Sequence, residues 1–445
     1  MASIKNTKDM TTGCPAFLLL TFSLPLMLGN LFQQLYTFVD ALIVGQCINS
    51  NALAALGATE WLTFIMFGVI QGITQGCSVV IAGFFGKKQT DSLKKALFSS
   101  YYIAAIGAVS FTAIGQILIV PSLKLLRTPT EVFSLTETYL RILYAGVPIT
   151  FIYNITAAIL RALGNSKKPL HAMVLASIGN IVFDLLFVMK LNMGIAGAAL
   201  GTLLAQVLAA LYCMISVRKI EICRLHSEHR TIDKNILLEQ FKMGVPMGIQ
   251  NMITAIGGLV VQATVNGFGI LFLTGYSAAN KLYVLLETAA TSYGHAILTY
   301  TAQNSGTNSN KRIRAGLIAA LWIGIATALI MSGIMVFAGQ EILGLFIKET
   351  ETKSAEMIQT GCDYLHVLAL GFPLLYCLYV LRCCIQGMGD SMIPMLSSFM
   401  QVTMRVICAL FFTRIVGHEA VFWGEVCAWV LADLFLTCAL YKRLT

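Results

Sequence analysis

Long apolar runs separated by short polar segments make up almost the whole chain. Each run is long enough to cross a bilayer, because a transmembrane helix needs about 20 apolar residues. Several runs are longer than that and should tilt in the membrane. The pattern therefore predicts an all-α integral membrane protein with twelve transmembrane helices, at residues 15–46, 52–83, 94–120, 134–160, 170–190, 194–217, 237–266, 274–303, 313–338, 357–386, 392–415 and 419–441.

Lysine and arginine are concentrated in every second connection between the predicted helices. The connections at residues 47–51 and 267–275 contain neither residue, while the segment with Lys124 and Arg127 and the short acidic segment near Glu349 and Glu351 are exceptions. Because cytoplasmic connections carry the excess of positive charge, the alternation predicts an even number of helices and two cytoplasmic termini. The basic positions are Lys87, Lys88, Lys94, Lys95, Lys167, Lys168, Arg218, Lys219, Arg224, Arg230, Lys234, Lys311, Arg312, Arg314, Lys442 and Arg443.

The two halves of the chain repeat each other. Pro25 and Asn30 recur at the same spacing as Pro246 and Asn251. Three further motifs recur at one common, slightly larger offset: Tyr139-Leu140 as Tyr364-Leu365, Gly146-x-Pro148 as Gly371-x-Pro373, and Gly164-Asn165-Ser166-x-x-Pro169 as Gly389-Asp390-Ser391-x-x-Pro394. Two six-helix repeats of the same orientation imply a pseudo-two-fold axis along the membrane normal, with substrate bound between them, as in many transporters. We expect an N-terminal lobe at 1–217, a cytoplasmic linker at 218–236 and a C-terminal lobe at 237–445.

Composition excludes several classes of protein. Of the 445 residues, 57% are hydrophobic and 11% are charged, against about 25% charged in soluble domains. The net charge of +9 is spread over the connections, so it indicates orientation in the membrane and not nucleic-acid binding. The twelve cysteines form no CxxC motif, and we find no metal-ligand spacing among the six histidines, His171, His226, His229, His295, His366 and His418.

The first apolar run carries the most informative polar residues. Pro25 removes a backbone N–H and should kink the helix. Gln33, Thr37 and Asp40 follow at positions i, i+4 and i+7, so they share one helix face. A charge at that depth costs about 3 kcal/mol or more and marks a functional site.

A second buried acid is predicted in the fifth span. Asp184 follows Asn180 by one helical turn, and Thr202 offers a hydroxyl from the sixth span. Together with Asp40 these residues form a set of hard oxygen ligands, which suits Na⁺, or a proton held by a carboxyl that burial and a like-charged neighbour keep neutral. The alternative is structural, with Asp184 paired to Lys190 and Asp40 capping a helix.

The second half lacks these acids at the equivalent positions. Val261 replaces Asp40, Ala409 replaces Asp184, and Arg405 replaces Asn180. We therefore expect the first half to couple to an ion and the second half mainly to line the substrate cavity. The roles of Lys281, Glu287 and His295 in the eighth span stay open: the first two could pair with other helices, and the histidine could relay protons or pack.

Polar and small residues on the spans suggest where helices and substrate meet. A polar stripe, Gln250, Asn251, Thr254, Gln262 and Asn266, either lines an aqueous cavity or joins helices. Gly68, Gly72 and Gly76 recur every fourth residue, which predicts close helix packing. The expected substrate-cavity residues are Gln33, Gln34, Tyr36, Thr37, Asn154, Gln250, Asn251 and Thr254.

Several of these motifs resemble the multidrug and toxic compound extrusion (MATE) family along essentially the whole chain. They are LPLMLGNLFQQLYTFVDALIVG around Asp40, ALAALGAT at 52–59, RALGNSKKP at 161–169 and QGMGDSMIP at 386–394. The resemblance implies twelve helices in two six-helix lobes around a V-shaped cavity. It also implies export of organic, often cationic, compounds in exchange for H⁺ or Na⁺.

Within that family the chain looks more like the DinF-like branch. That likeness implies a cation site in the first lobe, at Asp40, Asn180, Asp184 and Thr202. The NorM-like branch also has acids in spans seven and ten, whereas this sequence has uncharged residues at 252–256 and at Tyr376 and Cys377.

Three other functions are alternatives to efflux. A flippase for a lipid-linked oligosaccharide or peptidoglycan precursor would need a cation-rich cavity, which the first-half residues do not provide. A membrane enzyme would need a nucleophile with its base or a metal cluster, and a channel or scaffold would leave the buried acids idle. We therefore expect a monomeric, non-enzymatic transporter of small organic compounds in a bacterial inner (plasma) membrane, with H⁺ or Na⁺ as coupling ion, no other cofactor, no nucleic acid and no obligate protein partner.

Overall fold

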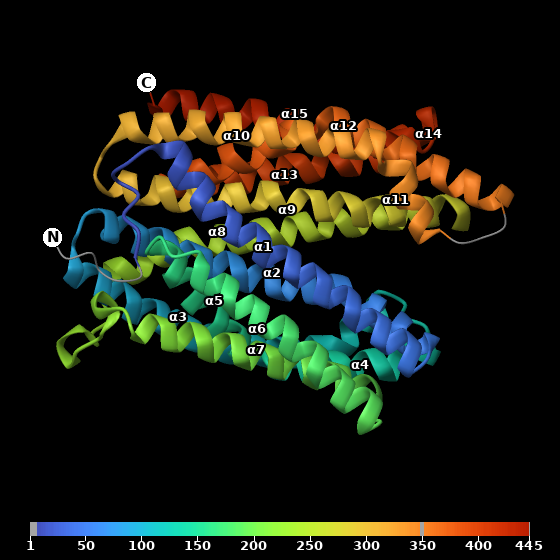
Figure 1. Cartoon of the computed structure of the whole chain (residues 1–445), viewed down its shortest axis with the longest axis horizontal. Coiled ribbons are helices and arrows are strands. Elements are labelled where there is room, and N and C mark those ends of the chain that lie inside the picture. Colours follow the sequence, from blue (N-terminus) through green and yellow to red (C-terminus); the bar gives the residue numbers. More distant parts are fainter. Residues whose placement is uncertain (1–6, 348–350, 445) are drawn as a thin grey trace. The chain divides into compact units, whose positions relative to one another are not determined.

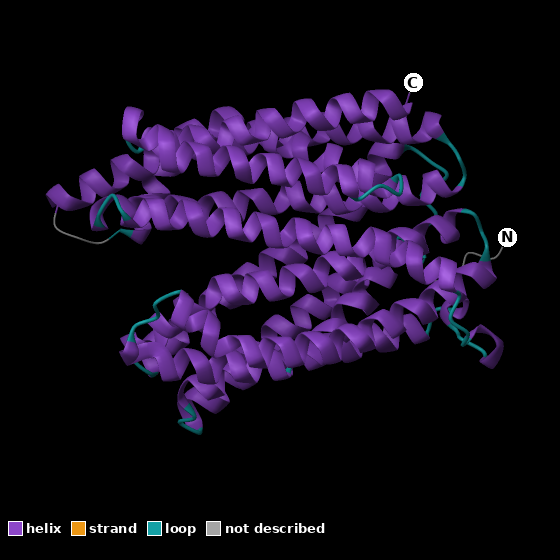
Figure 2. Ribbon diagram, turned by 180° about the vertical axis from the view of Figure 1, so that it is seen from behind, coloured by secondary structure: helices purple, strands orange, loops and turns teal. Residues whose placement is uncertain are grey.

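The computed structural model describes residues 7–347 and 351–444, which form helices and loops and contain no strand (Figures 1 and 2). The first half contains α1 (Pro15–Cys47), α2 (Ser50–Gly86), α3 (Thr90–Leu125), α4 (Thr130–Ala145), α5 (Val147–Ala162), α6 (Lys167–Asp184), the π-helix η1 (Leu185–Lys190) and α7 (Gly194–Arg218). The short 3₁₀ helices η2 (Glu221–Cys223) and η3 (Ser227–His229) lead to the second half. That half contains α8 (Lys234–Asn266), α9 (Ile270–Gly306), α10 (Asn310–Phe337), α11 (Gly339–Phe346), α12 (Glu351–Gly387), α13 (Met392–Ile407), the π-helix η4 (Cys408–Phe412), α14 (Thr413–Val416) and α15 (Glu419–Leu444).

Every predicted span coincides with one helix or with consecutive helical segments. Among the described residues, ten helices are long and apolar enough to cross a membrane. The predicted span 134–160 is a broken helix, because α4 and α5 bend by 49° at Gly146, just before Pro148. The predicted span 274–303 is α9, which is as long as the others but carries Lys281, Glu287 and His295. Counting the broken helix and α9, the spans number twelve.

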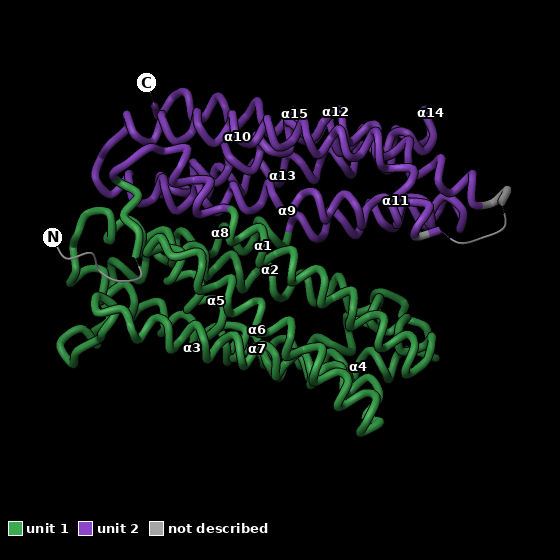
Figure 3. Tube along the Cα trace, in the orientation of Figure 1, with its two compact units in different colours: residues 1–11, 24–252 green, residues 12–23, 253–445 purple. Residues whose placement is uncertain are grey.

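The chain divides into two compact units (Figure 3). Unit 1 comprises residues 1–11 and 24–252, and unit 2 comprises residues 12–23 and 253–445. The division therefore falls inside α1, beside Pro25, and inside α8, between Met252 and Ile253. The lobe boundaries expected at 217 and 237 follow the sequence repeat and remain a prediction, because the limits of a repeat and the limits of a compact unit are different properties.

The glycine ridge of α2 lies against the first half of α8, within unit 1. A Cβ atom placed at Gly72 would lie 2.4 Å from the backbone nitrogen of Gly248, and one at Gly76 would lie 2.3 Å from the Cα of Gly244. The Nδ2 of Asn251 also donates a hydrogen bond to the carbonyl oxygen of Gly68, at 2.8 Å. The two backbones touch along two helical turns, which confirms the close packing that the glycine spacing predicts.

Gly72→Leu is expected to lower the free energy of unfolding by about 1–3 kcal/mol or more, because α2 and α8 must move apart to admit the side chain. The measurement is the fraction of detergent-solubilised protein that stays monodisperse after heating. Gly57→Leu is the matched control on the same helix, since nothing lies within 4 Å of a Cβ at that position. Equal losses for the two variants would contradict the close approach at Gly72.

The repeated Gly-Asx-Ser turn has the same structure in both halves. Gly164 and Gly389 have positive φ angles of 78° and 91°, a region that glycine enters without steric cost. The next side chain caps the following helix: Asn165 Oδ1 accepts from the Lys168 N–H at 3.0 Å, and Asp390 Oδ1 accepts from the Met392 N–H at 2.8 Å. The motif is therefore a turn that ends one span and begins the next.

The two halves also share a π-helical segment. η1 follows α6 and η4 follows α13, and α6 and α13 both begin just after the repeated Gly-Asx-Ser turn. Such segments are rare and often occur at functional sites. Asp184 is the last residue of α6 before η1, so the repeat places a distorted helix next to a predicted site residue.

In unit 2, α12 is the central helix. It packs against α9, α10 and α15, and it carries the buried aromatic residues Tyr364, Phe372 and Tyr376. The Tyr376 hydroxyl donates to the carbonyl oxygen of Leu286 on α9, at 2.9 Å. These contacts hold the core of the unit.

Candidate ion-coupling site

Unit 1 brings the four predicted coupling residues together from three helices. Asp40 lies on α1, Asn180 and Asp184 lie on α6, and Thr202 lies on α7. Asn180 and Asp184 are completely buried, and Asp40 is 7% exposed. The two residues of α6 share a face because they are separated by one helical turn.

Contacts between neighbouring helices fix this arrangement. The Ser177 hydroxyl on α6 lies 3.3 Å from the carbonyl oxygen of Phe32 on α1, about two helical turns before Asp184 and Asp40 respectively. The Nδ2 of Asn180 donates to the hydroxyl of Thr202 at 3.5 Å, which joins α6 to α7. At the end of α6, the carboxyl groups of Asp40 and Asp184 are close enough to interact directly.

Gly201 makes room for the second carboxyl group. A Cβ atom at this position of α7 would lie 2.2 Å from Asp184 Oδ1. Any larger residue would therefore push the Asp184 carboxyl group away from α7. Gly201 precedes Thr202, so one turn of α7 supplies both the space for the acid and the neighbouring hydroxyl.

Four acceptor oxygens at this site lack a donor. Within the described chain, no group donates a hydrogen bond to either carboxyl oxygen of Asp184, to Asp40 Oδ1 or to Asn180 Oδ1, and all four atoms are buried. Buried polar atoms normally have a partner, because an unsatisfied one costs free energy. A proton or a hard cation such as Na⁺ would satisfy these oxygens, and the donor set fits either one.

The structural alternative for the two acids is wrong. Asp184 does not pair with Lys190, since no described residue donates a hydrogen bond to either of its carboxyl oxygens. Asp40 does not cap a helix either, because it lies well inside α1, which continues to Cys47.

Two tyrosines also belong to this site. Tyr139 on α4 is 6% exposed and lies near Thr202, Asp40 and Asp184. Tyr36 lies one turn before Asp40 and interacts with both acids. Tyr36 was predicted as a cavity residue. Tyr139 was missed as a site residue, although its place in the repeated Tyr-Leu motif was a usable signal.

The other predicted cavity residues differ in their exposure and in their hydrogen-bond partners. Gln33, Gln34 and Thr37 are exposed, so they do not share the burial of Asp40. Asn154 donates to the Thr150 carbonyl oxygen on its own helix, at 2.9 Å. Gln250 is buried, whereas the side chain of Asn251 joins α8 to α2. Thr254 lies in unit 2. Their contact with substrate remains a prediction.

Unit 2 contains a buried group of charged residues that the sequence analysis largely missed. Arg405 on α13 forms a salt bridge with Glu425 on α15, at 2.5 Å, and the two side chains are only 15% and 11% exposed. Arg382 on α12 donates to Gln401 Oε1 at 2.7 Å. Asp433 on α15 is 8% exposed, and its carboxyl oxygens have no hydrogen-bond partner in the described chain. The buried acids in the described part of this half, Glu425 and Asp433, therefore lie on α15 and not at the repeat-equivalent positions.

The three residues of α9 whose roles the sequence left open have different environments. Glu287 accepts a hydrogen bond from the Tyr379 hydroxyl on α12, at 2.8 Å, so it pairs with another helix as one alternative proposed. Lys281 is exposed, and His295 is partly buried.

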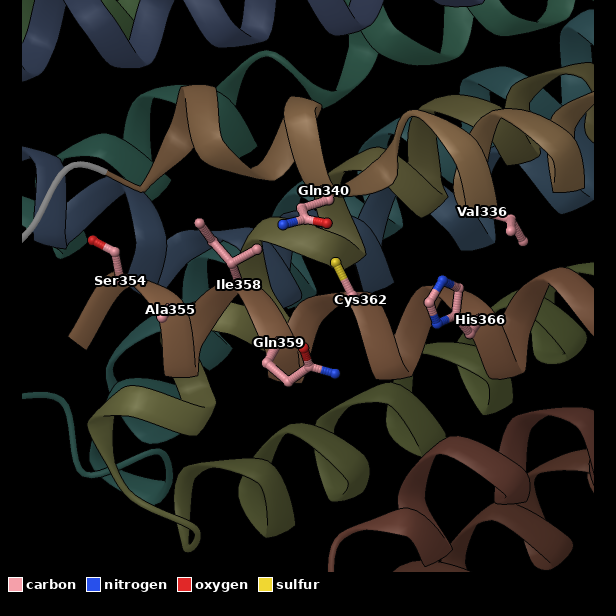
Figure 4. A pocket seen from close by; sticks show the side chains of 8 residues that line it. All are labelled: Val336, Gln340, Ser354, Ala355, Ile358, Gln359, Cys362 and His366. Atoms are coloured by element: carbon pink, nitrogen blue, oxygen red, sulfur yellow. The ribbon is translucent and has the colours of Figure 1, made fainter. Parts of the chain in front are cut away.

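A pocket of 610 Å³ lies elsewhere in unit 2, between the end of α10, α11 and the start of α12 (Figure 4). None of the predicted coupling residues lines it. The lining residues are Val336, Gln340, Ser354, Ala355, Ile358, Gln359, Cys362 and His366.

Known proteins resemble this chain in both sequence and structure. It is 28% identical over 382 residues to the probable multidrug resistance protein YpnP of Bacillus subtilis, covering 86% of this chain and 84% of that protein. It is 25% identical to the multidrug export protein MepA of Staphylococcus aureus, covering 95% and 94% of the two chains. A solved structure described as the outward-facing conformation of a multidrug resistance MATE family transporter superposes with a TM-score of 0.92 at 21% identity. The superposition covers 100% of this chain and 99% of the chain in that structure.

The fold and the buried acids define a class of protein: a multi-pass membrane transporter built from two six-span repeats. A model of the MatE family matches residues 25–186 and again residues 246–411. The chain belongs to this family. The two matches begin at the repeated prolines, Pro25 and Pro246, so the family model matches once in each repeat found in the sequence. The predicted twelve-helix, two-lobe membrane fold is therefore confirmed, while the axis between the lobes and the DinF-like branch remain predictions.

Proposed function

We propose that this chain is a secondary-active efflux antiporter that exports small organic, often cationic, compounds in exchange for H⁺ or Na⁺. One observation carries the proposal: the buried oxygens of Asp40, Asn180 and Asp184 that have no donor among the described residues. The relatives named as multidrug resistance and multidrug export proteins support the substrate class. The cluster of acids supports a coupling cation.

In this mechanism Asp40 and Asp184 hold the coupling cation. A proton would be shared between the two carboxyl groups, whereas Na⁺ would also use the amide oxygen of Asn180 and the hydroxyl of Thr202. Arrival of the cation removes negative charge from the site, so a cationic substrate is held less tightly. The two ligands thus oppose each other through a coupling free energy, about 1–3 kcal/mol in typical cases.

Transport in this mechanism proceeds by alternating access. α1 carries Asp40 and contains Pro25, where an interior hydrogen bond is missing. Neutralisation of Asp40 would change the bend of this helix, and the lobes would then rock between outward-facing and inward-facing states. The protein would act as a monomer in a bacterial plasma membrane, with both termini in the cytoplasm.

The test is transport by the purified protein in liposomes. We expect a fluorescent cationic dye to be moved against its gradient when either a pH gradient or a Na⁺ gradient is imposed, and the effective gradient identifies the ion. Dissipating that gradient with an ionophore should stop transport. If neither gradient drives movement of several dyes, antiport is overturned and a flippase for a lipid-linked precursor becomes the better hypothesis.

A further inference from the structure

The linker between α7 and α8 gathers three potential metal ligands. In the 3₁₀ turn η3, the backbone N–H of His229 donates to the carbonyl oxygen of His226, at 3.1 Å. Side chains three residues apart lie on the same side of such a turn, and the centroids of the two imidazole rings are 5.8 Å apart. One ligand atom from each of His226, Glu228 and His229 lies within 4.8 Å of the others. The sequence analysis found no ligand spacing among the histidines, whereas the structure brings ligand atoms of this pair and of Glu228 close together.

His229 has the environment of a metal ligand. Its side chain is 8% exposed, and its Nδ1 has no hydrogen-bond partner in the described chain although the atom is buried. Nδ1 lies 3.6 Å from Glu228 Oε1, on the side of the other ligands. On the opposite side of the ring, Nε2 lies 3.6 Å from Asp91 Oδ1, in the first turn of α3.

The position of Asp91 has a specific consequence. Metal-binding histidines usually give their second N–H to a carboxylate, which fixes the tautomer and the direction of the ring. With the proton on Nε2, on the side of Asp91, the lone pair of Nδ1 is left on the side of Glu228.

We propose that His226, Glu228 and His229 bind one divalent transition-metal ion of the zinc class, with Asp91 orienting His229. Two imidazoles and a carboxylate suit Zn²⁺, while Mg²⁺ prefers an all-oxygen set. Tetrahedral zinc with bonds of about 2.0–2.1 Å needs ligand atoms about 3.3 Å apart, so only a small contraction of the exposed side chains is required. The linker thiol, Cys223, is buried and does not belong to this group of ligand atoms.

The site would tie the linker to the start of α3, because η3 packs on α3. It lies wholly in unit 1 and shares no residue with the coupling site. Arg224 and Arg230 are exposed on either side of the ligands, so tryptic cleavage after them reports the order of the linker.

The experiment uses the full chain in detergent, purified with an affinity tag free of histidine and stripped with a chelator. Titration with ZnCl₂ should show one tightly bound ion per chain, and MgCl₂ should show none. The double variant His226→Ala/His229→Ala should bind zinc at least about tenfold more weakly, and Asp91→Asn about tenfold more weakly with unchanged stoichiometry. Zinc should also slow cleavage after Arg224 and Arg230 in the wild type but not in the double variant.

His418→Ala is the matched control, because that histidine is exposed in the other unit. Equal zinc affinity of the wild type and the double variant, or no zinc binding by the wild type, would overturn the proposal. Asp40→Asn should keep full zinc binding, which separates this site from the proposed antiport.

Discussion

Asp40→Asn is expected to lower gradient-driven dye export by about tenfold or more, within the range of about 5–150-fold that ion coupling typically supplies. Asparagine has nearly the same shape as aspartate but cannot be protonated at the oxygen or provide a negative charge. The site would then keep its packing around Asn180 and Asp184 while losing the charge that attracts the cation. Export by liposomes containing equal amounts of each protein is the measurement.

Asp184→Asn should have a similar effect, and the double variant should be little worse than either single one, because residues that act as a unit are not additive. The control is Glu137→Gln, which removes another carboxylate of unit 1 that pairs with Arg141 at the surface. Full export by Asp40→Asn under the same gradient would remove Asp40 from the mechanism.

Glu425→Leu alone is expected to destabilise the protein by about 3–5 kcal/mol, because it leaves the Arg405 guanidinium buried without its partner. Both side chains are largely removed from water, at 15% and 11% exposure. The Nε of Arg405 already lacks a hydrogen-bond partner in the described chain. The loss should be visible as early aggregation in a thermal unfolding experiment in detergent.

Replacing both partners, as Arg405→Met with Glu425→Leu, should recover most of that stability, since a buried ion pair contributes little more than apolar residues of similar volume. The control is Glu137→Leu, which breaks an exposed pair, with side chains 47% and 27% accessible, and should cost less than about 1 kcal/mol. A double variant as unstable as Glu425→Leu would show that the two residues act separately.

The secondary structure was predictable because a membrane imposes it. Apolar runs must form helices, since backbone groups have no other hydrogen-bond partners in the hydrocarbon. The predicted spans therefore coincide with helices, although several helices extend a few residues beyond them, as Thr90–Leu125 does beyond 94–120. One break was not predicted: the Gly-x-Pro motif gives a 49° bend between α4 and α5 at Gly146 but lies within continuous helix around Pro373 in α12.

The coupling residues could be predicted because a carboxylate or amide in a membrane span is rarely present without a role. The structure then places these residues together. The same reasoning should have selected Glu425 and Asp433 in the last span, but those residues were not considered. The repeated Tyr-Leu motif marked Tyr139, but only the packing of α4 against α7 brings this residue to the site. Its role depends on which helix faces α7.

The sequence by itself determined the helices, the two-fold repeat, the Gly-Asx-Ser turns and the acids of the first half. Each of these depends on residues close together in the chain or on matches at a fixed offset. Only the tertiary structure decided which helix faces meet. It placed Gly201 against Asp184, paired Arg405 with Glu425, and turned Nδ1 of His229 toward Glu228. Helical periodicity fixes the face on which a residue lies, but the neighbour of that face is set by the packing of helices distant in sequence.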